Sequence, residues 1–209
     1  MTRFQAFLLA AGLLCAASAF AQISPEEAKQ GFRPIFNGKS LDGWDGDPQL
    51  WSVRDGAIAG STEGVKLKHN TFLCYKENFS NFVLRLQVKL RNHNSGIQFR
   101  SQTFPEWVVK GYQADAAEGA WWGSIYEEGG KRGVLANGWA GKGEKVLRVG
   151  DWNDYEIFAK GDMMQLTLNG LVTATIWDKI SASGIIALQL HAGPAMQASF
   201  RNIRIKTIH

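Results

Sequence analysis

Cysteine is nearly absent from this sequence of 209 residues, which contains only Cys15 and Cys74. Cys15 lies in an N-terminal segment that we expect to be removed, so the mature chain keeps one thiol. A single thiol cannot form a disulfide within the chain, even in an oxidising compartment. Stability is therefore expected to come from packing of a hydrophobic core.

Long apolar runs are also missing beyond the N-terminus, so no permanent membrane span of about 20 residues is expected. The N-terminus has one basic residue, Arg3, then the apolar run Phe4 to Cys15, then Ala19-Phe20-Ala21 before Gln22. This order is typical of a cleaved secretory signal. We therefore predict a signal peptide at 1–21 and a secreted or periplasmic protein.

No block of like charge occurs. The formal net charge is +4, and loss of Arg3 leaves +3, with acidic and basic residues mixed along the chain. Nucleic acid is not an expected partner. The oligomeric state stays open.

Proline and helical periodicity are scarce as well, with 5 prolines in the chain. Ser24-Pro25 can start only a short helix before Gly31. After that the apolar residues alternate with period two, most clearly in 82–90, 97–100, 155–168 and 202–208. This alternation predicts that residues 22–209 form a single all-β domain, a sandwich of two antiparallel sheets with about a dozen strands.

One segment departs from this alternation. Between Gly119 and Gly143 there are 8 glycines and 3 tryptophans, with Glu127 and Glu128 between them. Aromatic residues at this density argue against disorder. We expect an ordered glycine-rich loop folded across one sheet face, where it narrows a groove.

Polar side chains occupy alternate positions on three expected strands, as Gln98/Arg100, Gln113/Asp115 and Gln189/His191. Each pair points away from the apolar face of its own strand. If the strands belong to one sheet, the six side chains share one face, which we expect to be the concave one.

These residue types suit carbohydrate chemistry. Asp115 or Glu127 can take a proton or activate water, His191 can shuttle a proton, and Arg100 can hold a developing oxyanion. These four are the candidate catalytic residues. Amides, rings and a further carboxylate suit sugar binding, and the candidate substrate-binding residues are Gln98, Gln113, Gln189, Trp121, Trp122, Tyr126 and Glu128.

Simpler interpretations stay open for the same residues. The alternating polar residues are also typical of a solvated strand face, Arg100 with Asp115 of a structural salt bridge, and His191 of a satisfied sheet histidine. The glutamates also fit a solvated loop. The remaining tryptophans that we considered, Trp44, Trp51, Trp152 and Trp177, are expected in the core. No tight metal-ligand spacing is present, so no cofactor is implied, although a divalent cation is left open.

Six segments together resemble a known family. They are FRPIFNGKSLDGW (32–44), WSVRDGAIAG (51–60), NSGIQFRS (94–101), GYQAD (111–115), DWNDYEIFAKGDMMQLTLNG (151–170) and GIIALQLHAGPAMQASFRNIRIK (184–206). In this order they are similar to the 3-keto-disaccharide hydrolase family. The resemblance implies a concanavalin A-like, laminarinase-type jelly roll and action on 3-keto-glycosides or related glycosides.

The chemistry implied by the resemblance is elimination next to a ketone. A C3 ketone acidifies the hydrogen at C2, so a base can form an enolate, the C1 substituent leaves, and water adds afterwards. Asp115 or a loop glutamate would be the base, Arg100 or a cation the enolate stabiliser, and His191 the acid or its orienter. The chain departs from the family at GYQADAAEG and LQLHAG, which places its substrate in doubt.

Two other classes of function compete with this exported hydrolase or lyase. A non-catalytic carbohydrate-binding module would use the same face without a base, and an interaction domain would fill the face with loop side chains. A carboxyl group with a shifted pKa beside the polar face would favour the enzyme.

Overall fold

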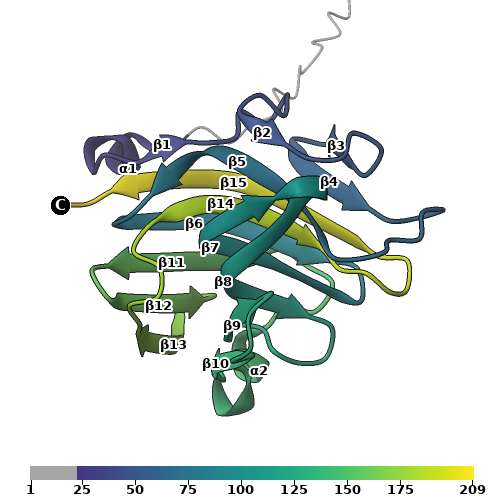
Figure 1. The fold of residues 1–209 in the computed structure, drawn as a ribbon. Coiled ribbons are helices and arrows are strands. Elements are labelled where there is room, and N and C mark those ends of the chain that lie inside the picture. Colours follow the sequence, from purple (N-terminus) through teal and green to yellow (C-terminus); the bar gives the residue numbers. More distant parts are fainter. Residues whose placement is uncertain (1–22) are drawn as a thin grey trace, which may run out of the picture.

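Two antiparallel β-sheets are stacked one behind the other in the computed structural model, which describes residues 23–209 (Figure 1). The all-β sandwich predicted from the alternation is confirmed, and its two sheets fit the jelly roll that the resemblance implies. The predicted signal peptide lies outside the described residues. No helix among those described is long and apolar enough to cross a membrane.

The described residues form fifteen strands, joined by short turns and a few helical turns. The strands are β1 (Arg33–Pro34), β2 (Trp44–Asp45), β3 (Trp51–Arg54), β4 (Ala57–Ser61), β5 (Thr71–Phe79), β6 (Phe82–Leu90), β7 (Asn94–Phe104), β8 (Val108–Ala117), β9 (Ile125–Glu128), β10 (Val134–Ala136), β11 (Asn153–Lys160), β12 (Met163–Leu168), β13 (Leu171–Trp177), β14 (Gly184–Leu190) and β15 (Gln197–Thr207).

The helical elements are short. They are α1 (Pro25–Lys29), η1 (Pro105–Trp107), η2 (Trp139–Gly143) and α2 (Glu144–Val146). In α1 the Ser24 hydroxyl accepts a hydrogen bond from the Glu27 backbone N–H at 3.1 Å, and Pro25 follows at the first helical position. This is the N-cap arrangement that the sequence predicts.

The eight-stranded sheet has the order β13-β12-β11-β6-β15-β4-β3, with β1 paired to β15. The seven-stranded sheet has the order β10-β9-β8-β7-β14-β5-β2. Every pairing is antiparallel, as between Ile157 of β11 and Leu84 of β6. The predicted hairpin at 155–168 is β11 with β12, in which Ile157 faces Leu166.

The main core fills the space between the two sheets. Phe82, Leu84, Leu86 and Val88 alternate along β6, and all are at most 1% exposed. Since side chains alternate across a strand, the intervening residues of β6 face away from the core. A second, smaller apolar cluster of Phe72, Cys74, Val109, Ile185 and Ala187 lies outside the main core. Cys74 is buried there, and burial raises the pKa of its thiol to about 12.

The glycine-rich segment is not a continuous loop, contrary to the expectation. It contains β9 and β10, which extend the seven-stranded sheet beyond β8, followed by η2 and α2. In Figure 1 these elements lie together below β8.

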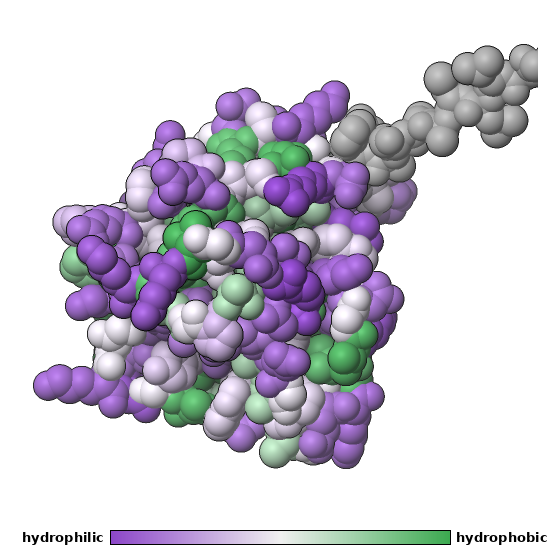
Figure 2. Space-filling view, turned by 90° about the vertical axis from the view of Figure 1, so that its right-hand side faces the viewer, coloured by the Kyte–Doolittle hydropathy of each residue, from purple (hydrophilic) through white to green (hydrophobic). Residues whose placement is uncertain are grey.

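The surface seen from the right-hand side of Figure 1 is mostly hydrophilic. Figure 2 shows small, separate hydrophobic patches on this face rather than one continuous apolar area. Trp44 and Trp51 are in the core as expected, at 5% and 4% exposure. Trp177 is 72% exposed and Trp152 is half-buried outside the core clusters, so the assignment of these two tryptophans to the core is wrong.

Candidate functional site

A row of amide side chains crosses the seven-stranded sheet on the face turned away from the main core. Ala187 of β14 faces Gln98 of β7, Gln98 faces Gln113 of β8, and Gln113 faces Tyr126 of β9. Gln98 and Gln113 are at most 2% exposed. The residues next to these amides in sequence, such as Ile97 and Ala114, belong to the main core. Alternation therefore brings the amides together as predicted.

The amides form a directed chain of hydrogen bonds. Gln98 Nε2 donates to Gln113 Oε1 at 2.6 Å. Gln113 Nε2 donates to Asp115 Oδ1 at 2.7 Å and points to Gln189 Oε1 at 3.4 Å. Gln189 Nε2 donates to Glu128 Oε2 at 3.2 Å. Each amide N–H donates to the next side chain, so this chain of hydrogen bonds ends at two carboxyl groups, Asp115 and Glu128.

Gly96 makes room for this chain. A Cβ atom added there would lie 2.5 Å from Gln113 Cδ and 2.6 Å from its Cγ. The Gln113 side chain therefore lies across the backbone of β7, opposite Asp115, which faces Gly96 in the register. Only glycine permits such a close approach without displacing the amide.

The backbone of Asp115 is held by a tyrosine of the opposite sheet. Tyr155, from the opposite sheet, donates its hydroxyl to the Asp115 carbonyl oxygen and accepts the Gly123 backbone N–H at 2.6 Å. Asp115 as a whole residue is 6% exposed. The pKa of Asp115 is raised to about 7, chiefly by burial and also by the charge of Glu128, while the hydrogen bond from Gln113 opposes the rise. A carboxyl group with such a pKa can hold a proton at neutral pH.

Glu128 has a different environment. It accepts a second hydrogen bond from Asn70 Nδ2, at 3.0 Å, in addition to that from Gln189. The site thus combines a buried carboxyl group whose pKa is raised with a second carboxyl group that accepts two amide hydrogen bonds.

These groups open onto a pocket of about 320 Å³. It is lined by Asn70, Asn94, Gln113, Asp115, Trp121, Tyr126, Glu128, Val134 and His191. Trp121 is 41% exposed, which leaves part of its indole surface open to a ligand. A ring beside amides and carboxylates is an arrangement suited to a sugar.

His191 lies at the same pocket, directly after β14. Its Nδ1 lies 2.6 Å from the Ala192 carbonyl oxygen. Because a carbonyl can only accept, Nδ1 carries the hydrogen and Nε2 is the nitrogen left for a ligand. The ring packs edge-on against His93, with the centroids 5.0 Å apart.

Arg100 does not share the face of Gln98, and this prediction is wrong. A β-bulge lies between Phe99 and Gln102 in the pairing with β8, and Arg100 has a φ of 47°. Its guanidinium donates to the carbonyl oxygens of Ser80 and Gly161, at 2.8 and 2.7 Å. Arg100 thus ties β7 to the turns before β6 and before β12. It forms no salt bridge with Asp115 either, and burial lowers the pKa of its guanidinium.

Glu127 is also placed away from the pocket, although it follows Tyr126 in β9. Its carboxylate is bound by Arg132, whose Nε donates to Oε1 at 2.8 Å. The Arg132 hydrogen bonds lower the pKa of Glu127. Strand alternation gives Tyr126 and Glu128 to the pocket and turns Glu127 to the other face. Glu127 is therefore not placed to transfer a proton to or from a ligand in this pocket.

Trp122 belongs to the core rather than to the sugar site. It is 3% exposed and stacks on Tyr155, with ring centroids 6.0 Å apart and an interplanar angle of 13°. Of the two adjacent tryptophans, only Trp121 lines the pocket.

Three polar residues of the site were not identified from the sequence. Ser101 occupies the position expected for Arg100 and donates its hydroxyl to Gln98 Oε1 at 2.8 Å. Asn70 comes from the segment before β5 and Asn94 from the start of β7. The Asn94 Oδ1 atom is buried without a hydrogen-bond donor among the described residues. No local pattern around these residues distinguishes them from ordinary turn and strand residues.

Metal ligands are not gathered at this pocket. Within residues 23–209, no group of three or more His, Cys, Asp or Glu side chains is placed to hold a metal ion. No cofactor is firmly implied by this arrangement.

Solved structures of carbohydrate-related proteins share this sandwich. A protein from Parabacteroides distasonis, provisionally named a glycosyl hydrolase, superposes with a TM-score of 0.67 at 21% identity, covering 90% of this chain and 99% of that one. The carbohydrate-binding module CBM66 from Bacillus subtilis superposes with a TM-score of 0.61 at 16% identity, covering 79% and 96%. At these identities the likeness establishes the jelly-roll fold alone.

The family follows from the sequence match. Residues 31–206 match the family described as the 3-keto-alpha-glucoside-1,2-lyase-like domain. Because the match spans most of the chain, the protein belongs to this family, as its six characteristic segments indicated. A search among curated proteins found no significant match.

Proposed function

We propose that this protein is an exported enzyme that cleaves 3-keto-glycosides, with Asp115 and Glu128 as its acid and base. The observation that carries the proposal is the pair of carboxyl groups at one pocket, joined through Gln113 and Gln189 but held in different environments. Two carboxyl groups at one pocket can serve as the acid and the base of a proton-transfer reaction.

The proposed reaction is an elimination. Glu128 takes the proton from C2, and the electron pair of that C–H bond passes to the C3 ketone to form an enolate. The enolate then forms the C1=C2 double bond as the C1–O bond breaks, and Asp115 gives its proton to the departing oxygen. The products are an alcohol and an unsaturated 3-keto sugar, to which water adds when the overall result is hydrolysis.

Other pocket residues serve binding in this scheme. Tyr126 lines the pocket, and burial raises the pKa of its hydroxyl, which favours the neutral donor. It replaces Arg100 as the proposed hydrogen-bond donor to the enolate oxygen. Trp121 covers the apolar face of the sugar, and His191 Nε2 binds a hydroxyl or relays the proton between Asp115 and the leaving group.

The test is turnover of matched α-glucosides and their 3-keto forms, with product release followed in D₂O. Elimination removes the hydrogen at C2, and the later addition of water puts a solvent deuterium there, whereas direct displacement by water leaves the hydrogen in place. The Asp115→Asn and Glu128→Gln variants should each lose about 10²–10⁴-fold in kcat. Glu26→Gln, at an exposed carboxylate of α1, serves as control. Full turnover by both site variants, in folded protein, would refute the assignment.

A carbohydrate-binding module remains the second candidate function, since the fold also matches CBM66. A module of this kind would bind the sugars without product release, and Asp115→Asn would leave its affinity nearly unchanged. The raised pKa of Asp115 favours the enzyme, because binding alone has no use for a carboxyl group that titrates near neutrality.

A further inference from the structure

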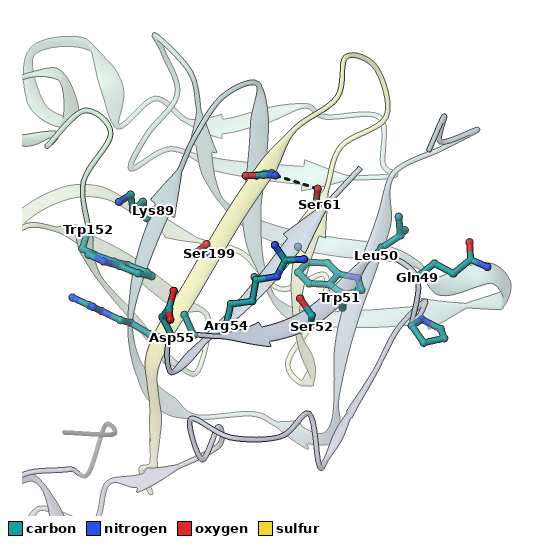
Figure 3. Close-up of a pocket in the computed structure, with 16 residues that line it drawn as sticks. Gln49, Leu50, Trp51, Ser52, Arg54, Asp55, Ser61, Lys89, Trp152 and Ser199 are labelled. Atoms are coloured by element: carbon teal, nitrogen blue, oxygen red, sulfur yellow. Dashed lines mark hydrogen bonds between the residues drawn. The ribbon is translucent and has the colours of Figure 1, made fainter. Parts of the chain in front are cut away.

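A second groove lies on the opposite side of the sandwich, on the outer face of the eight-stranded sheet. It crosses β3, β4, β15 and β6 and has a volume of about 450 Å³ (Figure 3). This volume is within the range of about 300–1,000 Å³ that is typical of ligand sites. None of the residues that line it belongs to the pocket of Asp115.

The groove arises from the order of side-chain sizes along one cross-strand row. Ser52 faces Ala59, Ala59 faces Ser199, and Ser199 faces Lys89. Three short side chains in succession leave a depression over the middle of the sheet, and long side chains border it. In Figure 3, Arg54 lies in the middle of the groove, with Lys89 and Trp152 to its left.

Cations border this groove without carboxylate partners. Neither Arg54 nor Lys89 forms an ion pair or a side-chain hydrogen bond with any residue that the structure describes. Arg201 donates Nε to the neutral amide of Gln87 at 2.8 Å. Asp55 is the one carboxylate among the lining residues, so three cations leave a net charge of +2 (3 − 1) at the groove.

Other arginines on the outer face of the same sheet are neutralised. Arg85 pairs with Glu27 at 3.0 Å and with Glu156 at 2.7 Å. Arg204 pairs with the same Glu27 at 2.8 Å. Unlike Arg85 and Arg204, the three cations of the groove have no carboxylate partner among the described residues, which points to an anionic occupant.

The uncharged lining points to a sugar. The hydroxyl groups of Ser52, Ser61 and Ser199 and the amide of Gln197 can both donate and accept hydrogen bonds, as sugar hydroxyls require. Trp152 supplies an aromatic ring, and the Arg201 guanidinium lies 4.0 Å from the ring centroid. One ring and three cations are few for a nucleic acid, which is bound through a series of stacked bases and phosphates.

We propose that this groove binds an acidic oligosaccharide, a chain of uronate units whose carboxylates meet Arg54, Lys89 and Arg201. This groove is separate from the catalytic pocket, and the proposal that it binds uronates does not depend on the proposed reaction. It would hold the protein on an acidic polysaccharide while the other sheet face acts on its own substrate.

The test compares galacturonate hexamer with the same hexamer after methyl esterification, by titration calorimetry on the protein from Gln22 onward. The two probes share a backbone and differ in charge. We expect binding of the acidic hexamer that weakens as salt is raised, because salt screens exposed charges. We expect at least about tenfold weaker binding of the ester.

Charge-removing variants locate the site. The Arg54→Gln/Lys89→Gln double variant should bind the acidic hexamer at least about tenfold more weakly. The control double variant Lys66→Gln/Lys145→Gln changes the net charge equally at exposed positions away from the groove and should bind as the parent does. Asp115→Asn should also bind as the parent does, which separates this groove from the catalytic pocket.

Three results would overturn the proposal. They are no binding of the acidic hexamer at low salt, equal binding of the ester, or equal loss of affinity in both double variants. Tighter binding of a single-stranded DNA hexamer than of the uronate hexamer would assign the groove to nucleic acid instead.

Discussion

The adjacent residues Trp121 and Trp122 have opposite environments. Trp121 is 41% exposed at the pocket, whereas Trp122 is 3% exposed and stacks on Tyr155. Trp121 has a φ of 68°, so the backbone turns sharply between the two rings. The sequence predicts two aromatic rings near the site, but their separation depends on this local turn.

These environments predict opposite effects of substitution. Trp121→Ala should raise KM about tenfold, since it removes a stacking surface, and leave the unfolding free energy nearly unchanged. Trp122→Ala should lower the free energy of unfolding by about 3–5 kcal/mol, because it leaves a cavity in the core. Urea unfolding and steady-state kinetics of both variants check this. A stable Trp122→Ala protein with impaired binding alone would contradict it.

Arg100 illustrates a failure of alternation at the residue scale. Its φ of 47° and the adjacent bulge rotate its side chain off the face that Gln98 occupies. Ser101 takes the expected place beside Gln98. A bulge adds one residue to one strand. Beyond it, the residues therefore face the opposite side of the sheet from the one that simple alternation predicts.

At the scale of elements, β9 and β10 form one side of the pocket, and Glu128 at the end of β9 lines it. Arg132, in the turn between them, holds Glu127 at 2.7 Å and also pairs with Asp178, which follows β13. Asp178 in turn accepts the hydroxyl of Tyr112 in β8. Arg132 therefore links the β9–β10 hairpin to the strands on either side of it.

Loss of this link should loosen the hairpin. Arg132→Gln should raise KM about fivefold, on the order of 1 kcal/mol, with a smaller change in kcat, since the pair is partly exposed and acts through position. Hydrogen exchange should become faster over residues 125–136. The neighbouring exposed Lys131→Gln is the control. Unchanged exchange in Arg132→Gln would show that the hairpin does not depend on this ion pair.

At the scale of the whole molecule, the buried Asp115 links stability to pH. Folding raises its pKa from the ordinary value of 3.8 to about 7. Between these values the folded protein binds a proton that the unfolded chain releases. The contribution to stability is therefore complete below pH 3.8 and is lost as pH rises toward and through about 7.

Asp115→Asn should remove this dependence. At pH 8 the variant should be more stable than the parent by on the order of 2–4 kcal/mol, and at pH 4 the two should be nearly equal. Urea unfolding at both pH values measures the difference. Glu26→Gln, at an exposed position, should be as stable as the parent at each of the two pH values. A variant that is less stable than the parent at pH 8 would mean that the carboxylate is ionised and stabilising in the fold.

The sequence by itself determined the sandwich and the polar face of the seven-stranded sheet. Both follow from alternation, which is a local property of each strand and is repeated along β6, β8 and β14. The tertiary structure decided which carboxyl groups meet. Glu128 joins Asp115 through Gln189, 61 residues away from Glu128 in sequence, and Arg100 is removed by a bulge and by contacts with Ser80 and Gly161. Such contacts depend on strand register and on partners far apart along the chain, which no local pattern contains.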